Sequence, residues 1–187
     1  MSKTALVIVD LQNDYFPGGK WPLSNTDAAA DNAARILAAF RAKGDPVIHV
    51  RHESKGADAS FFVPGSTGAE INAKVKNQGS EPVVTKNQIN AFLNTDLKAI
   101  LDKGGVTDVV IVGAMSHMCV DAASRAAADF GYKVTVIHDA CATHDQKFNG
   151  IKVPAAQAHA AFMAGLAFGY ANVTSAEAFL SGTKAAA

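Results

Sequence analysis

Short apolar runs alternate with longer segments of helical pattern along most of this chain. The runs are rich in valine and isoleucine and mostly lack strict apolar–polar alternation, so they predict strands buried on both faces of a parallel sheet. They cover residues 5–9, 47–50, 82–85, 109–112, 134–137 and 172–174. Helical patterns cover residues 28–43, 95–103, 119–130 and 154–169, and the capping-box spacing from Thr174 to Glu177 predicts a short final helix.

This alternation, with short connections, predicts an α/β fold. We expect an open, doubly wound, Rossmann-like and mostly parallel sheet of about six strands with helices on both faces. The length of 187 residues suits one domain, and no repeat or Pro-, Gly- or Ser-rich linker divides it. Residues 1–187 are therefore predicted to form a single domain, whose strand order the pattern leaves open.

Composition excludes several classes of partner. Seventeen basic and seventeen acidic residues cancel, so no excess charge favours nucleic acid or an anionic membrane. The first apolar run is too short for a signal peptide, and no apolar stretch reaches the roughly eighteen residues of a membrane helix. Two cysteines cannot form a framework of several disulfides. We expect a cytoplasmic protein that binds neither nucleic acid nor membrane.

Cys119 is the first candidate for chemistry. It follows the strand predicted at 109–112 and opens the helix predicted at 119–130. The positive end of a helix dipole favours the thiolate, and the free N–H groups of a helix start are suited to hold an oxyanion. The alternative is a buried structural cysteine.

Two further candidates follow other predicted strands. Asp10 ends the first strand and Lys86 ends the third. Parallel sheets bind ligands beyond the carboxyl ends of their strands, so an acid, a cation and the Cys119 thiol are expected at one edge. Separately, each has a plain structural interpretation: Asp10 as a turn cap and Lys86 as a surface lysine.

Four motifs extend this constellation. They are residues 5–16 (ALVIVDLQNDYF), 86–92 (KNQINAF), 113–120 (GAMSHMCV) and 131–143 (GYKVTVIHDACAT). In these motifs, and in their order, the chain resembles the isochorismatase-like cysteine hydrolases, from residue 5 to about 175. The resemblance implies a catalytic triad of Asp10, Lys86 and Cys119.

The resemblance also implies how the triad works. Cys119 attacks an electrophilic carbonyl and forms a thioester-type intermediate, Asp10 moves the protons, and Lys86 orients the carboxylate. A cis peptide bond between Ala114 and Met115 is implied as well, with the backbone there and at Cys119 facing the substrate oxygen. No cofactor is expected.

The presence of the cysteine favours C–N bond cleavage in a small amide, ureido compound or lactam. Family members that hydrolyse the enol ether isochorismate typically lack this cysteine, and nicotinamidases usually bind a metal through an Asp-x-His motif and a further histidine. Here the matching segment contains His49 and His52, which are three residues apart on the predicted strand and turn and are expected to point in different directions. We therefore expect no metal site, and both activities remain alternatives.

Readings from other classes stay open. A dinucleotide-binding enzyme would place a Gly-x-Gly-x-x-Gly motif after the first strand, where this chain has Asp10 to Asp14. A magnesium-dependent phosphoryl-handling domain would use Asp10 and Asp14 as ligands but leave Cys119 without a role. A catalytically silent binding module is the third reading.

Side chains expected to contact substrate come from the loops after strands one and two and from the cysteine motif. They are Gln12, Phe16, Trp21, Phe61 and His117. Cys141 is the rival nucleophile, but no helix start follows it, so a structural role is favoured.

Self-association is the last expectation. Residues 155–170 spread apolar side chains around much of a helix, and a second apolar face needs a partner. The resemblance implies the same, because family members commonly assemble, so we expect a homo-oligomer, at least a dimer.

Overall fold

The computed structural model describes residues 3–56 and 58–182. A six-stranded parallel sheet runs through its centre in the order β3-β2-β1-β4-β5-β8. Its strands are β1 (Thr4–Val9), β2 (Val47–His52), β3 (Val83–Lys86), β4 (Asp108–Ala114), β5 (Lys133–Ala142) and β8 (Ala171–Thr174). The predicted fold class is confirmed, and the tertiary structure adds the strand order.

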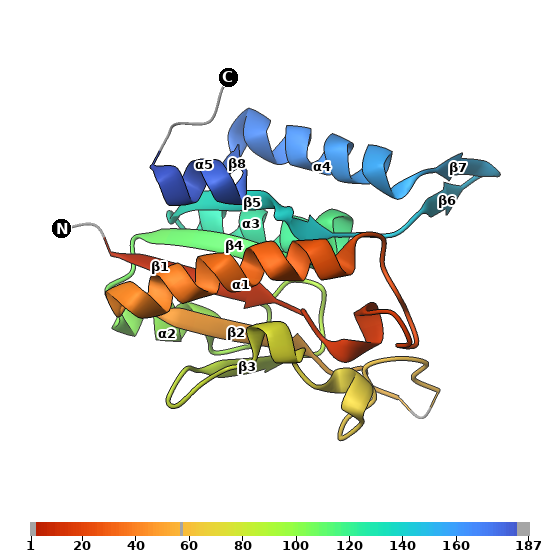
Figure 1. The fold of residues 1–187 in the computed structure, drawn as a ribbon, viewed down its shortest axis with the longest axis horizontal. Helices are drawn as coiled ribbons and strands as arrows, with labels where there is room; N and C mark the ends of the chain where they lie inside the picture. Colours follow the sequence, from red (N-terminus) through yellow and green to blue (C-terminus); the bar gives the residue numbers. More distant parts are fainter. Residues whose placement is uncertain (1–2, 57, 183–187) are drawn as a thin grey trace.

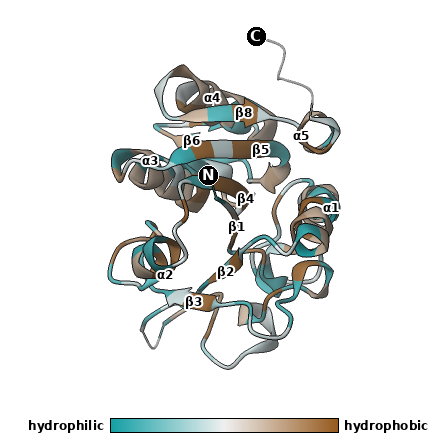
Figure 2. Cartoon of the chain, turned by 90° about the vertical axis from the view of Figure 1, so that its left-hand side faces the viewer, coloured by the Kyte–Doolittle hydropathy of each residue, from teal (hydrophilic) through white to brown (hydrophobic). Residues whose placement is uncertain are grey.

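Helices cover both faces of the sheet (Figures 1 and 2). On one face lie α1 (Thr26–Lys43) and α5 (Ala176–Ser181), which share a core with residues of β1 and β4. The other face carries α2 (Leu97–Lys103), α3 (Asp121–Asp129) and α4 (Ala155–Gly169). In β1, five of six residues are buried, as expected for a central strand with a core on each side.

Two local features shape the strands of the sheet. β3 lies at an end of the described sheet and alternates, with Val84 and Lys86 pointing inward and Val83 exposed. Gly113 lets β4 approach β1 closely, because a Cβ there would lie 2.0 Å from the carbonyl oxygen of Val9. Because the strands pair in parallel, the ends of β1, β3 and β4 lie on the same carboxyl edge of the sheet.

Two predicted boundaries need correction. The helix expected to open at Cys119 is preceded by a π-helical turn over Ser116–Val120, so Cys119 lies inside that turn and α3 begins at Asp121. β5 runs beyond the predicted residues 134–137, because a register shift opposite Ile111 and Gly113 interrupts the pattern and pairing then resumes at Cys141.

Short elements between the main ones were not predicted. Three 3₁₀ turns cover Asn13–Tyr15, Thr67–Ala69 and Ala73–Val75, and a hairpin of β6 (Gln146–Phe148) and β7 (Ile151–Val153) connects β5 to α4. The hairpin projects beyond the sheet (Figure 1). Within the described part of the chain, no helix has the length and apolar character needed to span a membrane.

Candidate active site

Three strand ends place the predicted acid, cation and thiol. Asp10 directly follows β1 and has a φ of 51°, a left-handed conformation that is uncommon outside glycine and clusters at functional sites. Lys86 is the last residue of β3, and Cys119 lies in the turn after β4. The structure brings together these three residues, whose catalytic roles remain predictions.

The centre of this group is the Lys86 ammonium nitrogen. Nζ lies 2.7 Å from Oδ2 of Asp10 and 3.3 Å from Sγ of Cys119. It also lies 3.0 Å from Nδ1 of His52 and donates to the carbonyl oxygen of Gln88 at 3.1 Å. Lys86 is only 1% exposed, so the surface-lysine interpretation is wrong.

Electrostatics keep this lysine charged. Burial alone lowers the pKa of Lys86, but the charges of Asp10 and Cys119 and their hydrogen bonds outweigh burial, so its pKa is raised. The pKa of His52 is lowered, by burial first and then by the Lys86 charge. A neutral His52 accepts from Lys86 through Nδ1, which assigns the ring proton to Nε2.

The thiol differs from the sequence-based expectation. The pKa of Cys119 is raised to about 12, by burial first and then by the charge of Asp10 and hydrogen bonding to it, while Lys86 acts in the opposite direction. Loss of water and a neighbouring carboxylate thus oppose the thiolate that the helix start was expected to favour. At neutral pH the thiol holds its proton beside a potential base.

The turn that carries Cys119 is held by its first residues. The peptide bond between Ala114 and Met115 is cis. Ser116 donates to the carbonyl oxygen of Ala142 at 3.2 Å, and His117 Nδ1 lies 2.6 Å from Thr143 Oγ1. Within the described residues, the backbone N–H groups of Ser116 and His117 have no hydrogen-bond acceptor.

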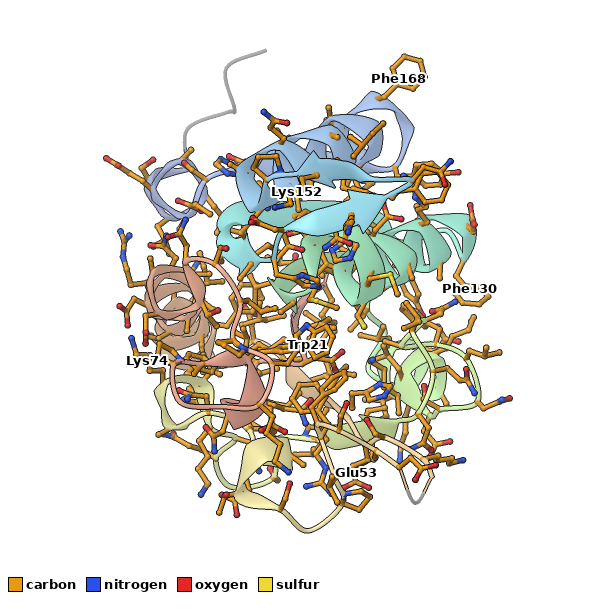
Figure 3. The ribbon with its side chains drawn as sticks, turned by 90° about the vertical axis from the view of Figure 1, so that its right-hand side faces the viewer. Trp21, Glu53, Lys74, Phe130, Lys152 and Phe168 are labelled. Carbon is orange, nitrogen blue, oxygen red and sulfur yellow. The ribbon has the colours of Figure 1, made fainter. Side chains whose placement is uncertain are left out.

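An arc of aromatic rings leads from the core to this turn. Consecutive ring centroids lie 4.6–6.1 Å apart along Phe62, Tyr15, Phe61, Trp21, His144, His117 and Phe162. Of the predicted substrate-contacting residues, Trp21, Phe61 and His117 belong to this aromatic arc. Trp21 is 39% exposed and lies near the middle of the view onto the carboxyl edge (Figure 3).

Two of the predicted substrate contacts lie in the protein interior. Gln12 is fully buried, and its amide donates to the carbonyls of His52 and Ala69, both at 2.8 Å, while Oε1 accepts from the His52 backbone at 2.7 Å. Its polar atoms thus hold two loops together. Phe16 is buried in the core that contains α1. Both residues support the loop structure.

Sequence reasoning gave three residues around the site no part in its chemistry. Tyr15 and Phe162 belong to the aromatic arc, and His52, which was considered only as a metal ligand, contacts Lys86. A signal existed for His52, because it ends β2 as Lys86 ends β3 and the two pair in register. No comparable signal marks Phe162, which reaches the arc from α4.

The residues considered as metal ligands have other contacts. His49 Nε2 lies 3.0 Å from Oε2 of Glu81, whereas His52 turns to Lys86. Asp14 accepts from the backbone of Lys20 at 3.2 Å and of Phe62 at 2.7 Å. Among the described residues, no three His, Cys, Asp or Glu side chains are grouped as metal ligands would be.

Comparison with known proteins identifies the family of the chain. The family model of the isochorismatase domain matches residues 4–178. The Bacillus subtilis isochorismatase family protein YddQ is 48% identical over 177 residues, which cover 95% of this chain and 98% of that protein. A streptothricin hydrolase of Streptomyces noursei is 34% identical over 75% of this chain and 50% of its own length.

A solved structure extends the likeness to three dimensions. The crystal structure of a putative isochorismatase hydrolase from Oleispira antarctica has a TM-score of 0.93 and 56% identity, covering 96% of this chain and 97% of that one. The match spans the sheet, its helices and the turn after β4. With its fold, its strand-end residues and these relatives, the chain belongs to the isochorismatase family and is an enzyme of hydrolase type.

Proposed function

We propose that this enzyme is a cysteine-dependent hydrolase that cleaves a C–N bond in a small amide, ureido compound or lactam. The observation that carries the proposal is the buried cluster in which Lys86 Nζ contacts both Asp10, at 2.7 Å, and Cys119, at 3.3 Å. A neutral thiol beside a carboxylate suits proton transfer during attack. The name of the streptothricin hydrolase agrees with hydrolytic chemistry.

The proposed reaction has two stages. In the first, Asp10 takes the thiol proton as Cys119 Sγ attacks the carbonyl carbon; collapse of the tetrahedral adduct breaks the C–N bond, and Asp10 protonates the leaving nitrogen. In the second, Asp10 takes a proton from water, the water oxygen attacks the thioester, and the thiol leaves with that proton. Lys86 keeps Asp10 oriented throughout.

The turn after β4 supplies candidates for oxyanion stabilisation. The free N–H groups of Ser116 and His117 lie in the same turn as Cys119. Backbone donors in a buried site stabilise negative charge on a tetrahedral adduct. We propose that they act together with the backbone at Met115 and Cys119.

A product screen tests this function. Primary amides and ureido compounds are assayed by ammonia release, and lactams by mass spectrometry of the opened acid, with wild type, Cys119→Ala and the matched variant Cys141→Ala. We expect hydrolysis by wild type and Cys141→Ala and none by Cys119→Ala. No turnover of any C–N substrate, with cleavage of isochorismate, would favour the enol-ether alternative.

Nicotinamide belongs in the same screen as the second alternative. A catalytically silent binding module would hydrolyse nothing, even where a compound of the panel protected its Cys119 from alkylation. Protection together with turnover supports the proposal.

We also propose that copies of this chain associate through α4. Phe168 is 96% exposed and projects away from the body of the molecule (Figure 3). The exposed face of α4 consists largely of alanine, and Phe148 and Ile151 are exposed on the hairpin at the opposite end of this helix. Exposed apolar side chains gathered along one element typically mark an interface. Light scattering should give a multiple of 19.4 kDa; the single-chain mass would contradict this.

A further inference from the structure

Tyr15 lies at the inner part of the aromatic arc and carries a hydroxyl group that the chemistry above leaves unused. Its ring packs edge-on against Phe62, with a centroid distance of 4.6 Å. The Phe62 ring lies 6.1 Å from that of His52, whose Nδ1 contacts Lys86. A single ring therefore separates Tyr15 from the residues that surround the Lys86 ammonium group.

The Tyr15 hydroxyl has no hydrogen-bond partner among the described residues. The residue is only 2% exposed. Among the described residues, the side-chain oxygens and nitrogens that are both fully buried and without a hydrogen bond belong to other residues. The Tyr15 oxygen, which also has no hydrogen bond, is therefore reached by solvent. Because buried polar groups are normally paired, this hydroxyl is available to a molecule that enters the site.

The backbone fixes the position of this side chain. Tyr15 ends a 3₁₀ turn, and its N–H donates to the carbonyl oxygen of Gln12 at 3.0 Å. Its carbonyl oxygen accepts from the backbone of Leu23 and from Thr26 Oγ1, both at 3.0 Å. A group held in this way loses little conformational freedom when it binds a ligand.

The charges around Tyr15 keep its hydroxyl protonated. Burial raises the pKa of Tyr15, and the negative charge of Asp10 raises it further. The hydroxyl is therefore protonated at neutral pH and able to donate a hydrogen bond. The neighbouring rings of Phe61, Phe62 and Trp21 carry no formal charge.

We infer that Tyr15 contacts the substrate directly, as an uncharged hydrogen-bond donor beside the scissile bond. This inference rests on the proposed function and adds a substrate class to it. The hydroxyl favours substrates with an acceptor atom next to the reacting carbonyl, and the uncharged rings around it favour a neutral group at that position.

Tyr15→Phe tests the inference, because it removes one oxygen that has no partner within the protein. Tyr132→Phe is the matched control: Tyr132 donates to Asp102 and precedes β5, at the opposite end of the strands. With the best C–N substrate from the screen, we expect Tyr15→Phe to lower kcat/KM about 10- to 100-fold. Tyr132→Phe should leave kcat/KM unchanged, and Tyr15→Phe should melt at the wild-type temperature.

Three results would overturn the inference. Unchanged kcat/KM in Tyr15→Phe would show that the hydroxyl does not contact the substrate. A lowered melting temperature would reveal a structural partner for it. If Tyr15→Phe slowed the alkylation of Cys119 by iodoacetamide as much as it slowed turnover, Tyr15 would act on the nucleophile. Full turnover by Cys119→Ala, in contrast, would refute the proposed function and is a separate result.

Discussion

The two cysteines of this chain lie in similar surroundings and differ in their partners. Cys119 follows β4 and Cys141 lies near the end of neighbouring β5, and both are buried. The pKa of each is raised to about 12, in both cases mainly by burial. Cys141 contacts the carbonyl oxygen of Ile137 at 3.4 Å, whereas Cys119 faces Lys86 and Asp10.

This comparison separates burial from reactivity. A raised pKa and low exposure describe both thiols, so neither property identifies a nucleophile. What distinguishes Cys119 is a buried carboxylate to accept its proton and an ammonium group to hold that carboxylate. The predictions below test whether these partners account for the difference.

The largest difference is expected in turnover. Cys119→Ala should lose about 10³-fold or more in kcat, because it removes one member of a unit that acts together. Cys141→Ala should keep wild-type turnover, because the Cys141 thiol donates to the backbone carbonyl oxygen of Ile137 and not to a carboxylate held by a lysine. Steady-state kinetics on the best C–N substrate decide between them. Loss of activity in Cys141→Ala alone would reverse the assignment of the nucleophile.

Asp10→Asn is expected to affect both activity and stability. Turnover should fall about 10³-fold with loss of the base. The free energy of unfolding should fall by about 3 kcal/mol, because Lys86 remains buried without its carboxylate. Urea denaturation measures this, with Cys119→Ala as the control that keeps the ion pair. Equal stability of the two variants would argue against the pair.

The alkylation rates of the two thiols should respond differently to Asp10→Asn. Since the Asp10 charge raises the pKa of Cys119, Asp10→Asn lowers it, increases the thiolate fraction at a given pH, and should speed reaction with iodoacetamide. Cys141 should react at its wild-type rate. Peptide mass spectrometry between pH 7 and about 9 follows both sites. A slower reaction of Cys119 in Asp10→Asn would contradict this direction.

Removal of metal ions by a chelator is expected to leave turnover and the reactivity of both cysteines unchanged. His49 and His52 are bound to Glu81 and Lys86. Prolonged treatment with EDTA followed by activity measurement checks this. Inhibition that zinc, manganese or iron reverses would show that a metal takes part.

The sequence determined the elements and the edge on which the chemistry lies. Valine- and isoleucine-rich runs mark strands with a core on each side, and carboxyl ends of parallel strands share one edge. Asp10, Lys86 and Cys119 could thus be placed together before their distances were known. The cis bond at Ala114 was available only through the resemblance, because no local pattern encodes it.

Only the tertiary structure decided strand order, side-chain partners and the protonation of the thiol. The pKa of Cys119 depends on water excluded by distant segments, and the partners of Gln12 and Tyr15 come from residues more than 35 positions away, at His52, Phe62 and Ala69. Phe162 arrives from α4, nearly 150 positions from Tyr15 in the chain. Local pattern fixes backbone geometry, whereas contacts between such separated residues arise only when the whole core packs.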